Sequence, residues 1–157
     1  MPMMTVADLP ADTYVRIKPD GNNVQFRIAE RDGSFKILGN GDMLGGLDLV
    51  GVLDILWMAY NIEAVHGWGP FLMDIALEWA TEKGGGVFPH NCGIVPPAKV
   101  MWKIYYEQRT DVRHLEMPDE LITTCNVRHA EPELRCIYEK TPFLLPALDA
   151  AGLLIRG

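Results

Sequence analysis

The chain has 157 residues, of which 48% are apolar and 22% are charged, and its formal net charge is −7. This length and composition are typical of one folded domain and exclude an intrinsically disordered chain. The acidic balance argues against nucleic acid as the main partner, because neutralising phosphates requires a basic surface.

Cysteine usage and hydropathy indicate the setting of the protein. The three cysteines form no CxxC pair, which argues against a disulfide framework, and their spacing to the histidines matches no familiar metal-ligand pattern. The first ten residues lack a basic region and a long apolar core, and the apolar run at 47–62 is short and contains acidic residues. We therefore expect a reduced, cytoplasmic protein with no metal site, no signal peptide and no membrane span.

The first 64 residues predict strands that are joined by turns. Apolar and polar residues alternate in short runs, and glycine, proline and asparagine cluster between the runs. The predicted strands lie at 13–18, 24–29 and 35–38, followed by one long or two short strands within 47–64 in the centre of the sheet. The predicted connections are a turn at 19–22, a hairpin turn at 31–34 and a flexible loop at 39–42 with 45–46.

A glycine-rich turn with Gly67 and Gly69 leads into an amphipathic helix, in which Pro70 suits the first helical position. The apolar stripe of this helix consists of Phe71, Leu72, Ile75, Ala76 and Trp79, and the helix is expected to end at Lys83. Glycine leaves its amide uncovered, and the helix dipole is positive at this end, so the turn is a candidate phosphate site. The alternative is a tight turn whose glycines serve only the backbone.

The second half predicts a strand at 87–88, a loop at 90–95, a second helix at 98–108, a last strand at 134–139 and an apolar tail at 144–155. The inner side of the second helix is expected to carry Val100, Met101, Ile104 and Tyr105. The whole pattern predicts one mixed α+β (α/β) domain over 1–157, with a central mixed sheet flanked by helices. Residues 110–157 would form a C-terminal extension with the last strand and the apolar tail.

Four short motifs follow one another in a distinctive order between residues 57 and 125. They are Gly67-Trp68-Gly69-Pro70-Phe71-Leu72-Met73-Asp74, then Gly84-Gly85-Gly86, then Val100-Met101-Trp102 with Tyr105-Tyr106, and finally Arg109-Thr110-Asp111-Val112. In this order they resemble the core of the GNAT N-acetyltransferase superfamily, and more narrowly a GNAT-like group common in bacteriophages. The resemblance implies that acetyl-CoA, or another acyl-CoA, binds between two splayed parallel strands.

The resemblance also implies a function for individual residues. The strand end at Ile62 and Ala64 would hold the pantetheine arm, and the amides around Gly67, Trp68, Gly69 and Phe71 would hold the pyrophosphate. A base would take a proton from the amine substrate, and an acid would reprotonate the thiolate. The candidate bases are Asp54 and Glu63, with His90 as a third, and the candidate acids are Tyr105 and Tyr106. The alternatives are that Asp54 faces solvent and that the two tyrosines pack the helix.

Three positions depart from the GNAT pattern. Ala64 stands where these enzymes usually have arginine or glutamine. Trp102 stands where they usually have the tyrosine that reprotonates the thiolate, and Pro70 removes one N–H group from the turn. Two functions therefore stay open. One is a phage-type CoA-dependent N-acyltransferase in the host cytoplasm. The other is a catalytically silent GNAT fold that serves as a virion component and contacts virion proteins through its C-terminal tail. The acyl group, the acceptor and the oligomeric state are left open.

Overall fold

The computed structural model describes residues 4–30, 43–53, 55–65, 67–89, 96–118, 121 and 131–156. The strands are β1 (Thr13–Asp20), β2 (Asn23–Glu30), β3 (Met43–Leu53), β4 (Leu56–Ala64), β5 (Gly86–Pro89), β6 (Val112–Glu116), β7 (Cys136–Lys140) and β8 (Leu154–Arg156). The α-helices are α1 (Trp68–Glu82), α2 (Pro96–Glu107) and α4 (Leu144–Ala150), and the 3-10 helices are η1 (Val6–Asp8) and η3 (Pro132–Arg135).

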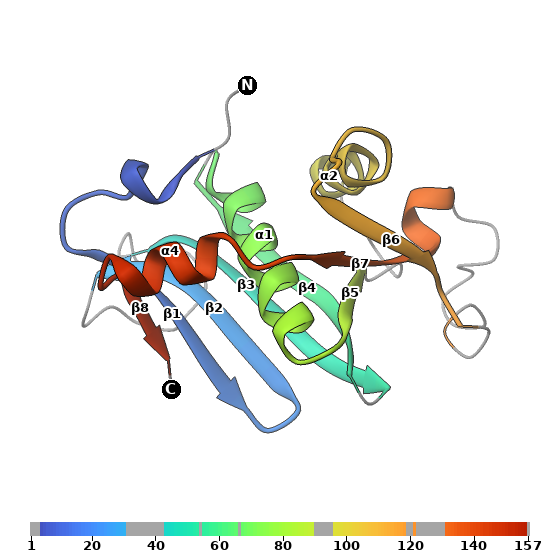
Figure 1. Cartoon of the computed structure of the whole chain (residues 1–157), viewed down its shortest axis with the longest axis horizontal. Coiled ribbons are helices and arrows are strands. Elements are labelled where there is room, and N and C mark those ends of the chain that lie inside the picture. The colour runs from blue at the N-terminus through green and yellow to red at the C-terminus, as the bar shows by residue number, and fades with distance from the viewer. Residues whose placement is uncertain are drawn as a thin grey trace.

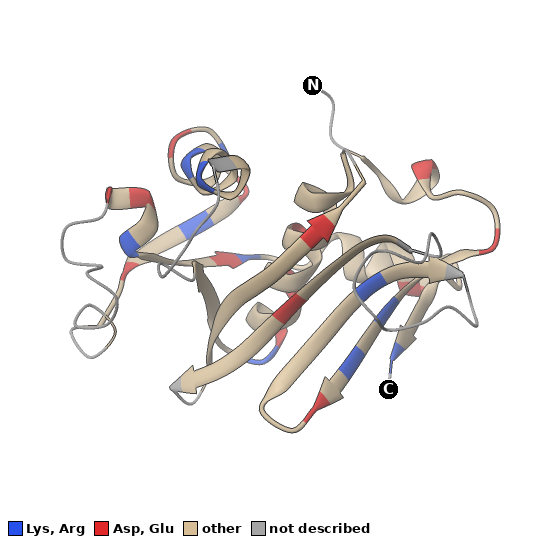
Figure 2. Cartoon of the chain, turned by 180° about the vertical axis from the view of Figure 1, so that it is seen from behind, with Lys and Arg blue, Asp and Glu red and all other residues tan. Residues whose placement is uncertain are grey.

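The strands form one mixed sheet in the order β6-β7-β5-β4-β3-β2-β1-β8 (Figure 1). Strands β1 to β4 are antiparallel neighbours, whereas β4 pairs with β5, and β1 with β8, in parallel. Helices α1 and α4 lie against one face of the sheet (Figure 1), and Figure 2 shows the opposite face. The predicted class, a central mixed sheet flanked by helices, is confirmed. The run at 47–64 belongs to β3 and β4, which are central, as predicted.

Helix α1 crosses the middle of the sheet and organises the core. Every side chain from 71 to 80 is buried, including the predicted apolar stripe. The helix contacts strands β2 to β5 and β7 of the sheet, and it also contacts α4. The polar side chains of Asp74 and Glu78 are therefore enclosed as well, and each of them needs a buried partner.

The C-terminal segment completes the same core. Leu144, Leu145 and Leu148 of α4 are buried, and β8 adds a parallel strand beside β1. These three leucines therefore pack inside the chain's own core, and the contact of the tail with virion proteins stays a prediction. Among the residues described, no helix combines the length and the apolar composition that a membrane crossing needs.

Several local predictions were also wrong. Gly45 and Gly46 lie inside β3 and not in a flexible loop, and β6 was not expected. Val100 and Ile104 were expected on the inner face of α2, but both are exposed. The buried side chains of this helix are Trp102 and Tyr105. The strand expected at 35–38, its hairpin turn at 31–34 and the loops at 39–42 and 90–95 lie outside the described residues.

Candidate functional site

The junction between β4 and α1 is built on a left-handed glycine. Strand β4 ends at Ala64, and α1 begins at Trp68, with Gly67 as its N-cap at φ 96° and ψ −22°. A side chain would strain this conformation, so Gly67 is required by the turn itself. Gly69 lies within the first helical turn and has no positive φ. The alternative that the glycines serve only the backbone of a tight turn therefore explains Gly67. It does not explain Gly69, whose φ is not positive.

The helix begins two residues earlier than predicted, which changes the amides that can bind an anion. An α-helix leaves its first N–H groups without helical acceptors. The Trp68 amide already donates to the Val65 carbonyl at 3.0 Å, and Pro70 has no N–H. Phe71 is the fourth helical residue, where the N–H enters the helical ladder. Gly67 and Gly69 are therefore the candidate amide donors for an anion, and the predicted roles of the Trp68 and Phe71 amides stay predictions.

Strands β4 and β5 are paired over only part of their length. Their parallel register runs from Leu56 beside Gly86 to Ala59 beside Pro89. Beyond that point β4 continues to Ala64, and no described residue of β5 pairs with it. The backbone edge at 60–64 is therefore open toward β5 within the described residues, and it leads directly to the glycine turn. Ile62 and Ala64 lie on this edge, as predicted, with partly buried side chains.

A β-bulge lies in the same part of β4. The register with β3 skips from Gly46 beside Glu63 to Asp48 beside Tyr60, which leaves one extra residue in β4. Asn61 there has a φ of 50°, which is uncommon for a residue with a side chain, and its side-chain amide lies 3.5 Å from Asp48 Oδ2. Bulges and strained residues of this kind are concentrated near functional sites.

The side chains around the β4–α1 junction are apolar and closely packed. Trp68 and Phe71 are buried and pack edge to face, with ring centroids 5.2 Å apart. On the outer side, the Met4 side chain lies close to Gly67, since a Cβ at Gly67 would approach Met4 Cε to 2.9 Å. Gly69 has open space, because the nearest atom to a Cβ there would be the Ala64 methyl group at 3.8 Å.

Tyr105, a predicted acid, belongs to a buried polar network that joins α1 to α2 and the segment after it. Its hydroxyl donates to Asp74 Oδ1 at 2.6 Å, and Arg109 donates to both Asp74 oxygens, at 3.3 and 2.9 Å. Burial raises the pKa of Asp74 against the opposing effect of its Arg109 and Tyr105 bonds. Burial and the Asp74 charge raise the pKa of Tyr105 well above its ordinary value. This geometry supports the alternative in which Tyr105 packs the helix.

The other predicted site residues are placed as follows. Trp102 is 1% exposed and packs on Tyr138 with ring centroids 5.0 Å apart, so it is a core residue and not a proton donor. Glu63 is exposed near the end of β4, and Tyr106 is half-buried on α2 beside His114. Asp54 and His90 lie outside the described residues. No group of three or more metal-ligating side chains occurs in the described part of the chain.

No protein-family model matches the chain, and no curated protein matches it. Three solved structures are similar in fold. One is an acetyltransferase of the GNAT family from Staphylococcus aureus, with 12% identity, a TM-score of 0.41, and coverage of 77% of this chain and 69% of the other. A candidate acyl-CoA N-acyltransferase from Klebsiella pneumoniae has 12% identity, a TM-score of 0.42, and coverage of 79% and 74%. A candidate N-acetyltransferase from Lactobacillus plantarum has 16% identity, a TM-score of 0.41, and coverage of 76% and 70%.

Proposed function

We propose that this chain binds an acyl-CoA at the β4–α1 junction and transfers the acyl group to an amine. The observation that carries the proposal is the pairing of β4 with β5, which among the described residues ends at Ala59, so that the edge at 60–64 leads to a glycine-capped helix N-terminus. An open strand edge offers backbone groups to an extended amide chain such as pantetheine. The amides of Gly67 and Gly69, at the positive end of the α1 dipole, suit a diphosphate.

The bound acyl-CoA would supply the acyl thioester, and the chain would supply positioning and proton transfer. Glu63 is the candidate base at the end of β4, with Asp54 as the second candidate. Tyr106 is the candidate acid, because Tyr105 is committed to Asp74. Further elements of the proposal are acetyl as the acyl group, a small amine as the acceptor, and a phage-encoded enzyme that acts in the cytoplasm of its host.

A second function is favoured by specific contacts. The Trp68 amide is already bonded, and Trp102 fills the core at the position where the resemblance expects an acidic tyrosine. These contacts support a catalytically silent GNAT-like fold that serves as a structural component, such as one of a phage virion. The two functions differ in one measurable property, which is the affinity of the junction for acyl-CoA.

Thermal unfolding with acetyl-CoA separates the two functions. A ligand that binds only the folded state raises the melting temperature, and at a concentration of 100 times Kd it adds about 2.7 kcal/mol of stability. We expect a dose-dependent rise for the wild type. No rise at millimolar acetyl-CoA would contradict the acyltransferase and leave the silent fold. Release of free CoA thiol with a panel of amines would then distinguish turnover from binding alone.

A Gly69→Asp variant tests the binding position. The new carboxylate has room, and it would lie at the helix N-terminus, where a negative charge stabilises a helix by about 0.3–1 kcal/mol. We expect the variant to be at least as stable as Gly69→Asn and to lose the acetyl-CoA response by repelling the diphosphate. Gly69→Asn, the neutral control of similar size, should keep most of the response. Equal responses of the two variants would place the diphosphate elsewhere.

A further inference from the structure

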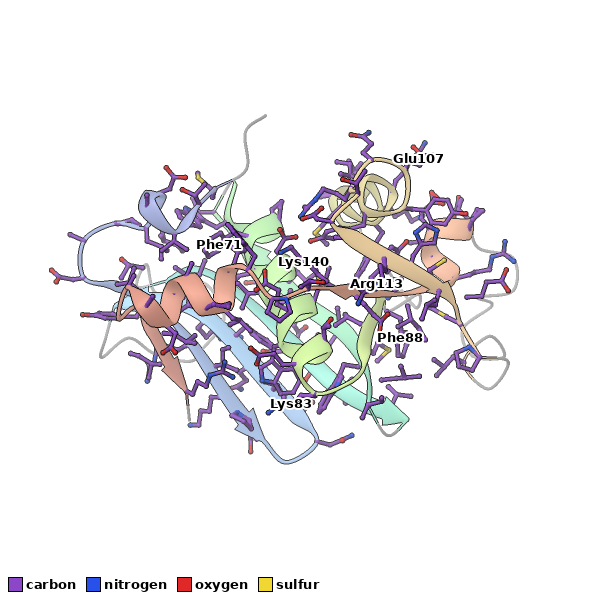
Figure 3. The ribbon with its side chains drawn as sticks, viewed as in Figure 1. Phe71, Lys83, Phe88, Glu107, Arg113 and Lys140 are labelled. Carbon is purple, nitrogen blue, oxygen red and sulfur yellow. The ribbon has the colours of Figure 1, made fainter. Side chains whose placement is uncertain are left out.

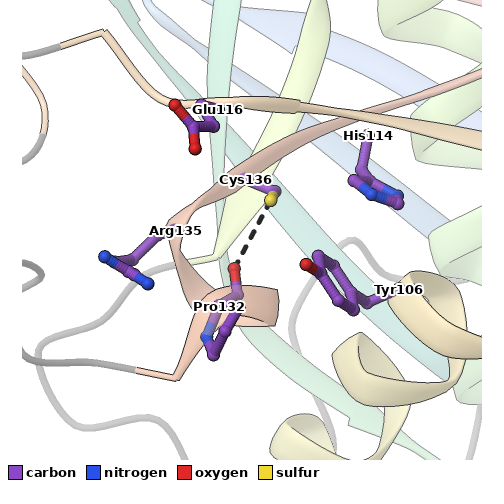
Figure 4. Close-up of a pocket in the computed structure, with 6 residues that line it drawn as sticks. All are labelled: Tyr106, His114, Glu116, Pro132, Arg135 and Cys136. Carbon is purple, nitrogen blue, oxygen red and sulfur yellow. Dashed lines mark hydrogen bonds between the residues drawn. The ribbon is translucent and has the colours of Figure 1, made fainter.

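A pocket of about 300 Å³ lies near the edge strand β6 of the sheet, between α2, β6 and the η3–β7 junction. Its lining residues are Tyr106, His114, Glu116, Pro132, Arg135 and Cys136 (Figure 4). The pocket shares Tyr106, the candidate acid, with the proposed acyl-transfer site, and none of its lining residues belongs to β4 or α1. Its volume is at the lower end of the range for small-molecule sites in proteins.

The pocket presents one cationic and one anionic side chain, Arg135 and Glu116. No described residue forms an ion pair with either of them. The Nε atom of Arg135 is buried and has no hydrogen-bond acceptor within the described residues. Because this guanidinium forms no ion pair with a described residue, its charge is available to a bound carboxylate, which guanidinium N–H groups bind by charge-assisted hydrogen bonds. The opposite charge of Glu116 suits a ligand that also carries a cation.

An aromatic wall bounds another side of the pocket. The rings of Tyr106 and His114 lie 4.4 Å apart between centroids at 31°, which joins α2 to β6. Figure 4 shows the Tyr106 hydroxyl end directed toward Pro132 and Cys136. Such a wall suits an apolar or aromatic group on a ligand.

The thiol in the pocket, that of Cys136, is poorly suited to act as a nucleophile. Cys136 Sγ donates to the Pro132 carbonyl at 3.4 Å, and burial, followed by the Glu116 charge, raises the pKa of this thiol. A raised pKa lowers the fraction of reactive thiolate, which suits a binding site.

From this geometry we infer that the pocket binds a small zwitterion with an aromatic group, which is the chemistry of an aromatic α-amino acid. Its carboxylate would lie at Arg135, its ammonium at Glu116, and its ring against the Tyr106 and His114 wall. A bidentate carboxylate is the ligand that a guanidinium matches best. This site goes beyond the proposed acyl transfer, and it requires no acyl-CoA.

Calorimetric titration of the full chain, without acyl-CoA, tests the inference with three related probes. They are L-phenylalanine, phenethylamine without the carboxylate, and 3-phenylpropionate without the ammonium. We expect phenylalanine to bind at least tenfold more tightly than either of the other two. Absence of phenylalanine binding at millimolar concentration, or equal affinity for all three, would overturn the inference.

Two variants test which side chain binds each charged group of the ligand. Arg135→Gln should remove the preference for phenylalanine over phenethylamine, and Glu116→Gln should remove the preference over 3-phenylpropionate. Arg113→Gln is the matched control, because Arg113 alternates with His114 and Glu116 on β6 and is exposed on the other face. The His114 ring protons of the wild type provide a second readout by NMR. They should shift with phenylalanine, and unchanged signals would also overturn the inference.

Discussion

Among the described residues, three buried carboxylates join separate parts of the core, and each of them has a cation beside it. Asp48 lies 2.7 Å from Arg27, Asp74 lies 2.9 Å from Arg109, and Glu78 lies 2.6 Å from Lys140. In α1 the two acids are four residues apart, which in a sequence is the pattern of a solvated face. They are buried because chain after residue 96 covers that face, and their partners lie 35 and 62 residues away. Helical spacing alone could not predict these pairs.

Glu78 is the acid on which most contacts converge. Its carboxylate accepts bonds from Lys140 Nζ, beside α1 in Figure 3, and from three backbone amides at the start of α4. Glu78→Gln would leave the Lys140 ammonium buried without its counter-charge. We expect urea unfolding to show a loss of about 3–5 kcal/mol. Glu82→Gln, which affects only the exposed pair with Arg156, should cost less than about 1 kcal/mol. Similar losses in both variants would contradict this role.

The ion pair between Asp111 and Arg109 makes the stability of the fold depend on pH. Its bidentate bond with Arg109 lowers the pKa of the carboxyl below 3.8. The ion pair therefore stabilises the fold above the unfolded pKa and is lost as pH falls through the lower, folded pKa. Because Asp111 is half exposed, the gain is at most about 1 kcal/mol. Denaturant titrations from pH 6 to pH 2 should show wild type and Asp111→Asn differing at pH 6 and converging in acid. A difference independent of pH would refute the assignment.

At the scale of the element, apolar patterns predicted several of the segments that contribute to the core. This holds for β1, β2, α1 and β7, whose bounds were approximated within a few residues. Strand β6 was missed because it is an edge strand with one buried side chain, Val112, so it has no alternation to detect. Gly45 and Gly46 are typical of loops, but here they allow Leu72 and Arg27 to pack closely against β3.

Substitutions in α4 and at its N-cap test whether the C-terminal segment is part of the core. Leu148 is fully buried, whereas Phe143, five residues earlier, is 72% exposed. We expect Leu148→Ala to cost about 2–5 kcal/mol in chemical denaturation, as a truncation in a packed core does. Phe143→Ala should change stability by no more than about 0.5 kcal/mol. If Leu148→Ala were as mild as Phe143→Ala, the segment would be an appendage and not part of the fold.

At the scale of the whole molecule, the sequence predicted the junction between a central strand and a helix, and the structure shows where that helix begins. The order of strand, glycine turn and helix was sufficient to predict a junction at residues 62–71. The start of the helix at Trp68 depends on the φ of Gly67 and on the Val65 carbonyl, which no composition pattern encodes. Because the molecule carries a net charge of −7, an anionic ligand must rely on local amides and the dipole of α1.

The pocket between α2, β6 and the η3–β7 junction could not be predicted from the sequence in this way. Its lining combines side chains from α2, β6 and the η3–β7 junction, which only the strand order β6-β7-β5 brings together. Tyr106 was predicted as a site residue from its motif, whereas Glu116 and Arg135 carried no signal in the sequence.

Two-dimensional amide NMR with acetyl-CoA tests the central claim most directly, because it reports on the Gly67 and Gly69 N–H groups themselves. The claim predicts saturable shifts of both glycine signals, shared with residues 60–64, and their absence in Gly69→Asp. Glycine signals that stay unchanged at millimolar acetyl-CoA, or shifts confined to other parts of the protein, would contradict it.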